Sequence, residues 1–284
     1  MKNLYILTIA VILLINCSYL PTKSNNNKMN VISLINQGNA YWGKRANHKS
    51  AKLAVLFYKK AFEINKADVD LAASLSKAYF FQANYLESDL NKRDTLFLKG
   101  AESALTGFEN SEFYQSFIDT TKFEINEIKL EAIKKAPIET IGVLFWWSFN
   151  QGKFLINKPV IDRINSREIL EVAMHRISTL DEDYYYGGPT RFFGMFYSRL
   201  PGVPLDRAKL NFDQSLQHNP NFFGTKFLRS RYFHTKLGNR ELFEEDLQFI
   251  INGDPSLLPD AMPENLFEQQ KAKKLLRDAT ILFE

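Results

Sequence analysis

The chain has 284 residues, a formal net charge of +4 at pH 7 and an aromatic content of 14%. Its basic residues are spread along the sequence rather than gathered into a patch or stripe, which argues against a nucleic-acid-binding protein. The 24 phenylalanines and 12 tyrosines indicate a large packed interior or an apolar cavity, two possibilities that composition does not separate.

The N-terminus has the pattern of an export signal. Lys2 gives a positive start, and residues 4–15 are almost unbroken apolar sequence. This run is shorter than the about 20 apolar residues that span a bilayer, and it has the size of the apolar centre of a signal peptide. Residues 1–16 are therefore predicted to be a signal peptide that is removed after export.

The single cysteine of the chain, Cys17, follows this segment directly. The surrounding residues resemble the lipobox of bacterial lipoproteins, in which the cysteine becomes the acylated first residue of the mature chain, although Asn16 replaces the usual small residue. We expect Cys17 to be lipidated; the alternative is a plain secretory signal with a chance cysteine. Residues 17–28 are polar and are predicted to be a flexible, lipid-anchored linker, which leaves residues 29–284 as a single domain.

The rest of the sequence is predicted to be helical nearly throughout. Between residues 51 and 64, apolar side chains recur at positions 54, 57, 58, 61 and 62, which is the spacing of one helix face. Residues 166–177 repeat this spacing, with Ser166 as the expected N-cap. Glycine and proline clusters at 187–189, 200–202, 237–239 and 252–255 are expected to separate helices. The sequence contains no convincing strand alternation, so the predicted fold class is all-α.

Small and aromatic residues recur in a pattern that resembles the tetratricopeptide repeat, in which paired helices cross at small residues. The best copy has Gly194 and Tyr197 on its first helix, followed by Ala208, Phe212, Ser215 and Pro220. Weaker copies begin at Gly38, Leu75 and Phe145. The pattern predicts stacked helical hairpins that curve into a compact ring or superhelix. A generic helical bundle that matches the loose pattern by chance is the alternative.

The stretch from Tyr184 to Phe283 resembles one family in particular, the TatT family of tetratricopeptide-repeat T-components of tripartite (TRAP-type) transporters. The residues that carry the resemblance are Gly187, Gly188, Pro189, Arg191, Gly194, Tyr197, Pro201, Gly202, Ala208, Phe212, Pro220, Phe243 and the run from Ala272 to Leu276. The resemblance implies a periplasm-facing lipoprotein that forms a homo-oligomer, a trimer, and docks a periplasmic substrate-binding (P) component. It also implies a channel through the helical ring for a hydrophobic, lipid-like ligand.

One candidate for the lining of such a site is the segment that contains Tyr185, Tyr186 and Arg191. Its glycines permit backbone angles that other residues avoid, and Pro189 suits the first turn of a helix. Amides at the helix start, together with Arg191, could hold a carboxylate or phosphate head group. Alternatively, the same residues form a tight turn in which the arginine bridges two helices.

The other candidate is the aromatic run Phe145, Trp146 and Trp147. Because Phe145 and Phe149 share one helix face while Trp146 points elsewhere, the helix is apolar on both sides. Such a helix is either buried in the core or lines an apolar cavity, and Phe192 poses the same choice.

The sequence lacks the motifs of common catalytic sites. Its four histidines are scattered without an HExxH pair, and neither a P-loop nor a G-x-S-x-G elbow occurs. We therefore expect a non-enzymatic protein without a metal ion or cofactor. A helical-repeat adaptor for cell-envelope assembly and a hydrolase built on a helical ring are the alternatives. Ser18, rather than an aspartate, follows the cysteine and favours the outer membrane.

Overall fold

The computed structural model describes residues 23–284, so the predicted signal peptide and Cys17 lie outside the described residues. Over this range every regular element is a helix and no strand occurs, which confirms the all-α prediction. None of the helices described is long and apolar enough to cross a membrane.

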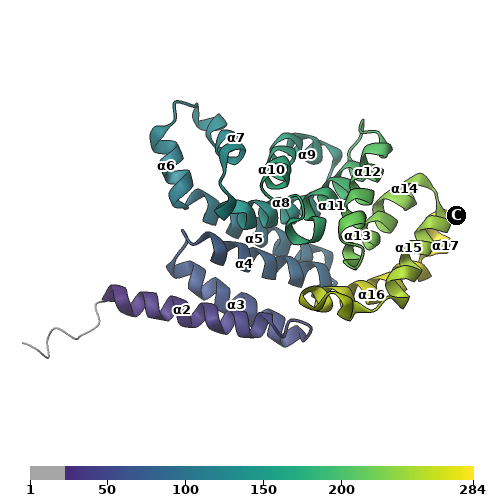
Figure 1. Ribbon diagram of the computed structural model, residues 1–284, viewed down its shortest axis with the longest axis horizontal. Coiled ribbons are helices and arrows are strands. Elements are labelled where there is room, and N and C mark those ends of the chain that lie inside the picture. Colours follow the sequence, from purple (N-terminus) through teal and green to yellow (C-terminus); the bar gives the residue numbers. More distant parts are fainter. Residues whose placement is uncertain (1–22) are drawn as a thin grey trace, which may run out of the picture.

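The first part of the chain forms antiparallel helical pairs around a buried helix (Figure 1). Its elements are α2 (Lys23–Trp42), α3 (His48–Ile64), α4 (Val69–Phe81), the π-helical η1 (Gln82–Leu86), α5 (Leu90–Glu109), α6 (Glu112–Thr120), α7 (Ile125–Lys135), η2 (Ile138–Thr140) and α8 (Ile141–Leu155).

The second part continues the same arrangement and then turns back toward the first hairpin. Its elements are α9 (Val160–Asn165), α10 (Arg167–Leu180), α11 (Tyr184–Arg199), α12 (Leu205–His218), α13 (Phe223–Leu228), the π-helical η3 (Arg229–His234), α14 (Thr235–Leu237), α15 (Arg240–Asn252), η4 (Pro255–Leu257), η5 (Pro259–Ala261), α16 (Met262–Arg277) and α17 (Ala279–Phe283).

The helical pairs cross where the repeat pattern predicts small residues. A Cβ atom on Gly194 of α11 would lie only 2.7 Å from the ring of Phe212 on α12, so the two helices approach closely at this glycine. In the first pair, a Cβ on Gly38 of α2 would lie 2.5 Å from the ring of Tyr58 on α3. The hairpins predicted from these spacings are therefore present.

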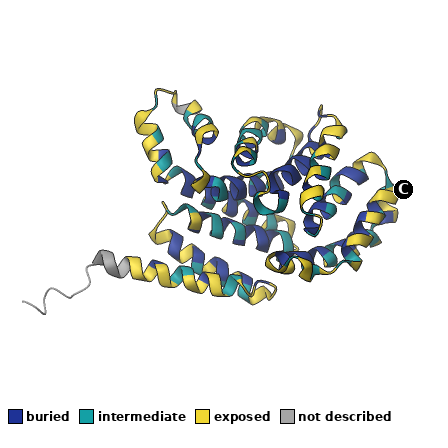
Figure 2. Ribbon diagram, in the orientation of Figure 1, coloured by how far each residue is buried: buried dark blue, intermediate teal, exposed yellow. Residues whose placement is uncertain are grey.

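Helix α8 forms the centre of the core, and α4, α5, α10 and α11 pack around it. Every residue from Val143 to Asn150 is buried, as expected for a helix that is apolar on all sides. Figure 2 shows buried residues along α4, α5, α8 and α11, with exposed residues on the outer faces of α2 and α6. The weak repeat that begins at Phe145 corresponds to the packed pair α8 and α10, with the short α9 between them.

Helix α16, the last long helix of the chain, closes the curve by contacting the first two hairpins. Arg45, in the turn between α2 and α3, forms a salt bridge of 2.7 Å with Glu264 of α16. Phe267 packs edge-on against Phe81 of α4, with 5.6 Å between ring centroids. Elements from the two ends of the described chain are thus joined, which matches the predicted compact ring.

Two local expectations differ from the structure. Ser166 occupies the N-cap position of α10 but makes no capping hydrogen bond, because its own backbone is already helical (φ −90°, ψ −3°). The cluster at 187–189, by contrast, lies at a break in helical geometry as expected, because Tyr185, Tyr186 and Gly187 have left-handed backbone within the bounds of α11. Helix α2 begins at Lys23, within the segment 17–28 that we expect to be a linker.

Candidate ligand-binding pocket

Helix α11 starts with a short left-handed turn. Tyr185, Tyr186 and Gly187 have φ angles of 50°, 61° and 66°, and right-handed helical geometry then continues to Arg199. For residues with a Cβ atom, left-handed backbone costs about 1–2 kcal/mol each, so two successive tyrosines in this conformation are unusual. Such strain persists only where the surrounding structure holds it.

Arg191 holds this turn in place. Its Nη1 donates a hydrogen bond of 2.7 Å to the carbonyl oxygen of Tyr186, and its Nη2 donates one of 2.9 Å to that of Tyr185. The guanidinium also lies 4.4 Å from the ring centroid of Phe222. These contacts support the interpretation of the segment as a structural turn, since the two nitrogens of the fork already have carbonyl acceptors.

The burial of Arg191 has an electrostatic consequence. Its side chain is 2% exposed, and no carboxylate pairs with it in the described part of the chain. Burial lowers the pKa of Arg191 to about 10. The guanidinium therefore remains charged at neutral pH and is stabilised by carbonyl dipoles and aromatic faces rather than by an ion pair.

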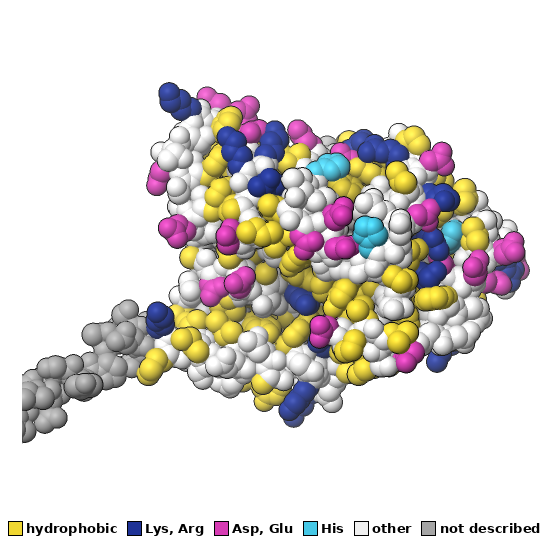
Figure 3. All heavy atoms as spheres, in the orientation of Figure 1, with side chains coloured by type: hydrophobic (Ala, Val, Ile, Leu, Met, Phe, Trp, Pro, Cys, Tyr) yellow, Lys and Arg dark blue, Asp and Glu magenta, His cyan; other side chains and the backbone are white. Residues whose placement is uncertain are grey.

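A narrow aromatic pocket lies between this turn, α8 and α16. Its cavity volume is about 20 Å³, and the space between its lining atoms, open solvent included, is about 380 Å³. We call it the aromatic pocket, and it is lined by Phe80, Asn84, Tyr85, Phe145, Trp146, Phe149, Lys153, Tyr185, Arg191, Phe222, Gly224, Leu228, Glu268 and Lys271. Figure 3 shows hydrophobic side chains gathered in the hollow between the first hairpin and the helices above it.

Four of the residues singled out in the sequence line the aromatic pocket. Phe145 and Trp146 come from α8, and Tyr185 and Arg191 come from α11. The two helices meet at the rings of Trp146 and Tyr185, whose centroids are only 4.7 Å apart. The two candidate segments therefore meet at one place, although about 40 residues separate them in the sequence.

The other three residues singled out in the sequence do not line the pocket. Trp147 is buried in the core but faces another part of it, since consecutive helical residues point in different directions. Tyr186 stacks on Phe222 outside the pocket, with 5.1 Å between ring centroids. Phe192 packs against Gly152, where an added Cβ would lie 2.6 Å from its ring. For Phe192 and Trp147, core packing explains the burial.

Several lining residues were not found from the sequence. Phe80 and Tyr85 come from α4 and η1, and Phe222 precedes α13. Tyr85 lies in a π-helical segment, a geometry that occurs frequently at functional sites. The sequence indicated these residues only through its general abundance of aromatic residues. A π-helical segment does not keep the spacing by which an ordinary helix face is recognised.

Besides Arg191, the charged residues that line the pocket are Lys153, Glu268 and Lys271. The ammonium of Lys271 lies 3.0 Å from both carboxylate oxygens of Glu268. Lys153 is 9% exposed, and burial lowers its pKa to about 8. Burial likewise raises the pKa of Tyr85 well above its ordinary value. The site therefore presents apolar rings with a charged border, an arrangement suited to binding apolar surface.

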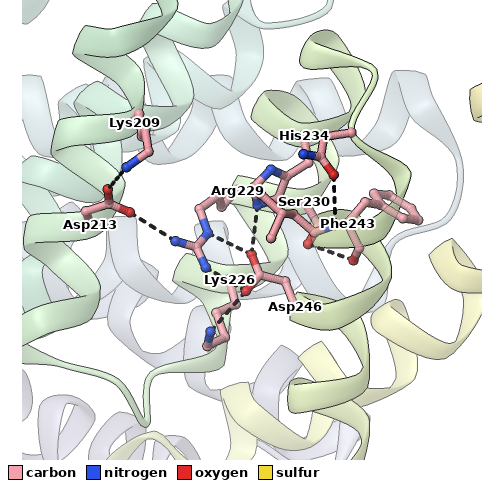
Figure 4. Close-up of polar contacts among 10 residues, drawn as sticks. Lys209, Asp213, Lys226, Arg229, Ser230, His234, Phe243 and Asp246 are labelled. Carbon is pink, nitrogen blue, oxygen red and sulfur yellow. Dashed lines mark hydrogen bonds and ion pairs between the residues drawn. The ribbon is translucent and has the colours of Figure 1, made fainter.

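A separate cluster of buried charges, outside the aromatic pocket, fixes α15 (Figure 4). Asp246 accepts two hydrogen bonds of 2.7 Å from Arg229 and one of 3.0 Å from Lys226, and Nε2 of His234 lies 3.3 Å away. Burial alone would raise the pKa of Asp246, but Arg229 and His234 hold it well below its ordinary value. The three neighbours Lys226, Arg229 and His234 come from α13 and η3, so the cluster joins these elements to α15.

No group of histidine, cysteine, aspartate and glutamate side chains in the described residues could hold a metal ion. In comparisons with known proteins, the model of the family described as TRAP transporter T-component matches residues 78–283, which is more than half of the chain. A search of curated proteins with this chain found no match. The matched range begins in α4 and includes every residue that lines the aromatic pocket.

Proposed function

The chain belongs to the TRAP transporter T-component family, as its resemblance to the TatT family implies, and we propose that it is a lipoprotein of the bacterial envelope that holds a hydrophobic ligand for a TRAP-type transport system. In this proposal it faces the periplasm, with the outer membrane favoured. It docks the periplasmic substrate-binding component and assembles as a trimer.

The observation that supports ligand binding is the position of the aromatic pocket. Its walls come from α4, η1, α8, α11, α13 and α16, so a ligand would contact elements from both ends of the curved fold. Half of the lining residues are aromatic, and rings bury large apolar areas at a low entropic cost. We propose a binding role rather than a catalytic one because this lining favours apolar contact.

The pocket can be tested with a neutral, apolar probe. Octanol should bind the purified domain, and Leu228→Trp should weaken binding at least tenfold, because the larger side chain fills space at the pocket wall. Leu237→Trp is the matched control, since Leu237 is 51% exposed on α14 and does not line the pocket. Calorimetric titration measures both affinities, and circular dichroism checks that each variant folds. Equal octanol affinity for the two variants would remove the pocket from the proposal.

Docking is tested in cells. Cross-linking in the native host followed by purification of the tagged protein should recover a periplasmic solute-binding protein. Recovery of envelope-assembly proteins in its place would instead favour the adaptor function.

The anchor is tested by metabolic labelling with palmitate. We expect Cys17 to carry the label, and Cys17→Ser should abolish it while the protein is still exported. Unlabelled wild-type protein would contradict the anchor but leave the pocket unaffected.

A further inference from the structure

A second chamber adjoins the aromatic pocket and differs from it in chemistry. Its cavity volume is about 330 Å³, and it shares Asn84, Lys153 and Lys271 with the aromatic pocket. We call it the basic chamber, and its other lining residues are Arg93, Phe97, Ile156, Asn157, Phe227, Arg231, Tyr232, Lys274, Leu275 and Asp278. The two spaces therefore adjoin at these three residues, with an apolar space on one side and a polar space on the other.

The polar end carries an excess of positive charge. Arg93, Lys153, Arg231, Lys271 and Lys274 line it, and Asp278 is the single acidic residue of this lining. These cations come from α5, α8, η3 and α16, so the fold gathers them from four separate elements. Like charges that converge in this way repel one another, and a bound anion would offset the repulsion.

Most of these cations form no ion pair in the described part of the chain, and the ammonium of Lys153 lies over the face of Tyr232, 5.9 Å from its ring centroid. Among the described residues, only Lys271 forms an ion pair, with Glu268. Lys153 is the most informative of the others, because its side chain is 9% exposed and no carboxylate pairs with it. A buried ammonium without a carboxylate partner is costly to the fold, and such groups are rare unless an opposite charge compensates them.

We propose that the basic chamber binds the anionic head group of an amphipathic ligand whose apolar part occupies the aromatic pocket. This inference rests on the proposed function, since it concerns the same site, and it specifies the ligand as a chain or ring system that ends in a carboxylate or phosphate. Lys153 and Lys271 stand at the border between the two spaces, where the head group of such a ligand would lie.

The remaining lining groups fit this chemistry. Arg93 and Arg231 each offer a planar fork of N–H donors that matches the oxygens of a carboxylate or phosphate. Asn84, Asn157 and Tyr232 add neutral polar groups that can complete the hydrogen bonding of an anion. Arg191, at the aromatic end, is instead held by the carbonyls of its own helix, so the cations available to a head group are those of the basic chamber.

The test compares ligands that share one chain and differ in head group. Octanoate and octyl phosphate should each bind at least tenfold more tightly than octanol at pH 7, and octyltrimethylammonium should bind more weakly than octanol. The difference between the two anions identifies which head group the chamber prefers. Calorimetric titration of the purified domain gives all four affinities.

Three variants locate the effect. Lys153→Met, Arg231→Gln and Lys274→Gln should each weaken octanoate binding about three- to tenfold. Arg231→Gln and Lys274→Gln, which do not line the aromatic pocket, should leave octanol binding unchanged. Lys273→Gln is the control, because Lys273 neighbours Lys274 on α16 but is exposed and does not line the chamber. Lys153→Met removes a buried charge that has no ion pair, so this variant should fold well. Arg231 and Lys274 are exposed, so their replacement should not disturb folding either.

The outcomes separate this inference from the proposed function. If octanol binds and octanoate binds no more tightly, the aromatic pocket stands and the anionic head group is wrong. The same conclusion follows if the three variants behave like Lys273→Gln. If neither ligand binds, the proposed function itself fails.

Discussion

The closure of the ring by α16 depends on a buried ion pair that can be broken and restored. Arg45 Nε lies 2.8 Å from Glu264 Oε1, and Nη2 lies 2.7 Å from Oε2, so the pair is bidentate. The two side chains are 8% and 3% exposed. The guanidinium also donates to the carbonyl of Asp260 and lies 4.6 Å from the ring centroid of Trp42. Glu264→Gln keeps the shape of the side chain and removes its charge.

The size of the effect follows from this burial. Loss of one partner of a buried pair costs about 3–5 kcal/mol, because the remaining charge stays buried without compensation. For a chain of this size, each kcal/mol lowers the Tm by about 2–4 °C, so Glu264→Gln should lower it by roughly 6–20 °C. The double variant Arg45→Met/Glu264→Met should lose at least about 2 kcal/mol less stability than the sum of the losses in Arg45→Met and Glu264→Met.

Urea denaturation of the wild type, Arg45→Met, Glu264→Met and the double variant measures the coupling directly, and Glu264→Gln is measured beside them. Glu63→Gln serves as the control, since Glu63 pairs with Lys59 at 3.6 Å with both side chains more than half exposed. That change should cost less than about 0.5 kcal/mol. If Glu264→Gln costs as little as the control, or if the two single effects simply add, then the ion pair does not hold α16 and the reasoning is wrong.

Three further predictions concern stability and are measured by urea denaturation. Gly187→Ala should cost about 2–4 kcal/mol, because its left-handed backbone resists a Cβ atom that would also lie 2.8 Å from Ser215 Oγ; Gly202→Ala, left-handed but with open space around it, should cost only about 1–2 kcal/mol. Asp246→Asn should cost about 3–5 kcal/mol at pH 7. Because the folded pKa of Asp246 is depressed, its stabilisation is present above pH about 4 and is lost as the pH falls further, and the variant should lack this part of the acid sensitivity. Lys153→Met should stabilise the protein by about 1–3 kcal/mol at pH 7. The wild type should gain stability as the pH rises from about 8 to 10, since unfolded chains bind more protons there, and the variant should not.

The hairpins were predictable because local residue types determine them. Gly38 and Gly194 mark positions where only a residue without a side chain permits the helices to approach, and Tyr58 and Phe212 fill the opposite positions. Helix α8 was equally readable, since a segment that is apolar on all sides must be buried. In each case the sequence contains the physical requirement within one or two helices.

The pocket was only half predictable, because its walls depend on how distant elements come together. Phe145, Trp146 and Tyr185 stand out as aromatic runs, whereas Lys153 and Lys271 look like ordinary lysines on helices. Their convergence results from the return of α16 to the first hairpins, which no local pattern encodes. The left-handed tyrosines were also unpredictable, since their conformation is imposed by Arg191 rather than by their own preference.

The features that reduce stability in this fold converge on one site. Tyr185, in the strained turn, lines the aromatic pocket. The π-helical segments η1 and η3 contribute residues to the aromatic pocket and to the adjoining basic chamber. The unpaired Lys153 stands at the border between them. A core selected for stability alone would replace such a lysine with methionine or leucine and would keep its helices regular. Irregular backbone and uncompensated charge that gather around a single cavity are what a binding site requires, because the compensation then comes from the ligand.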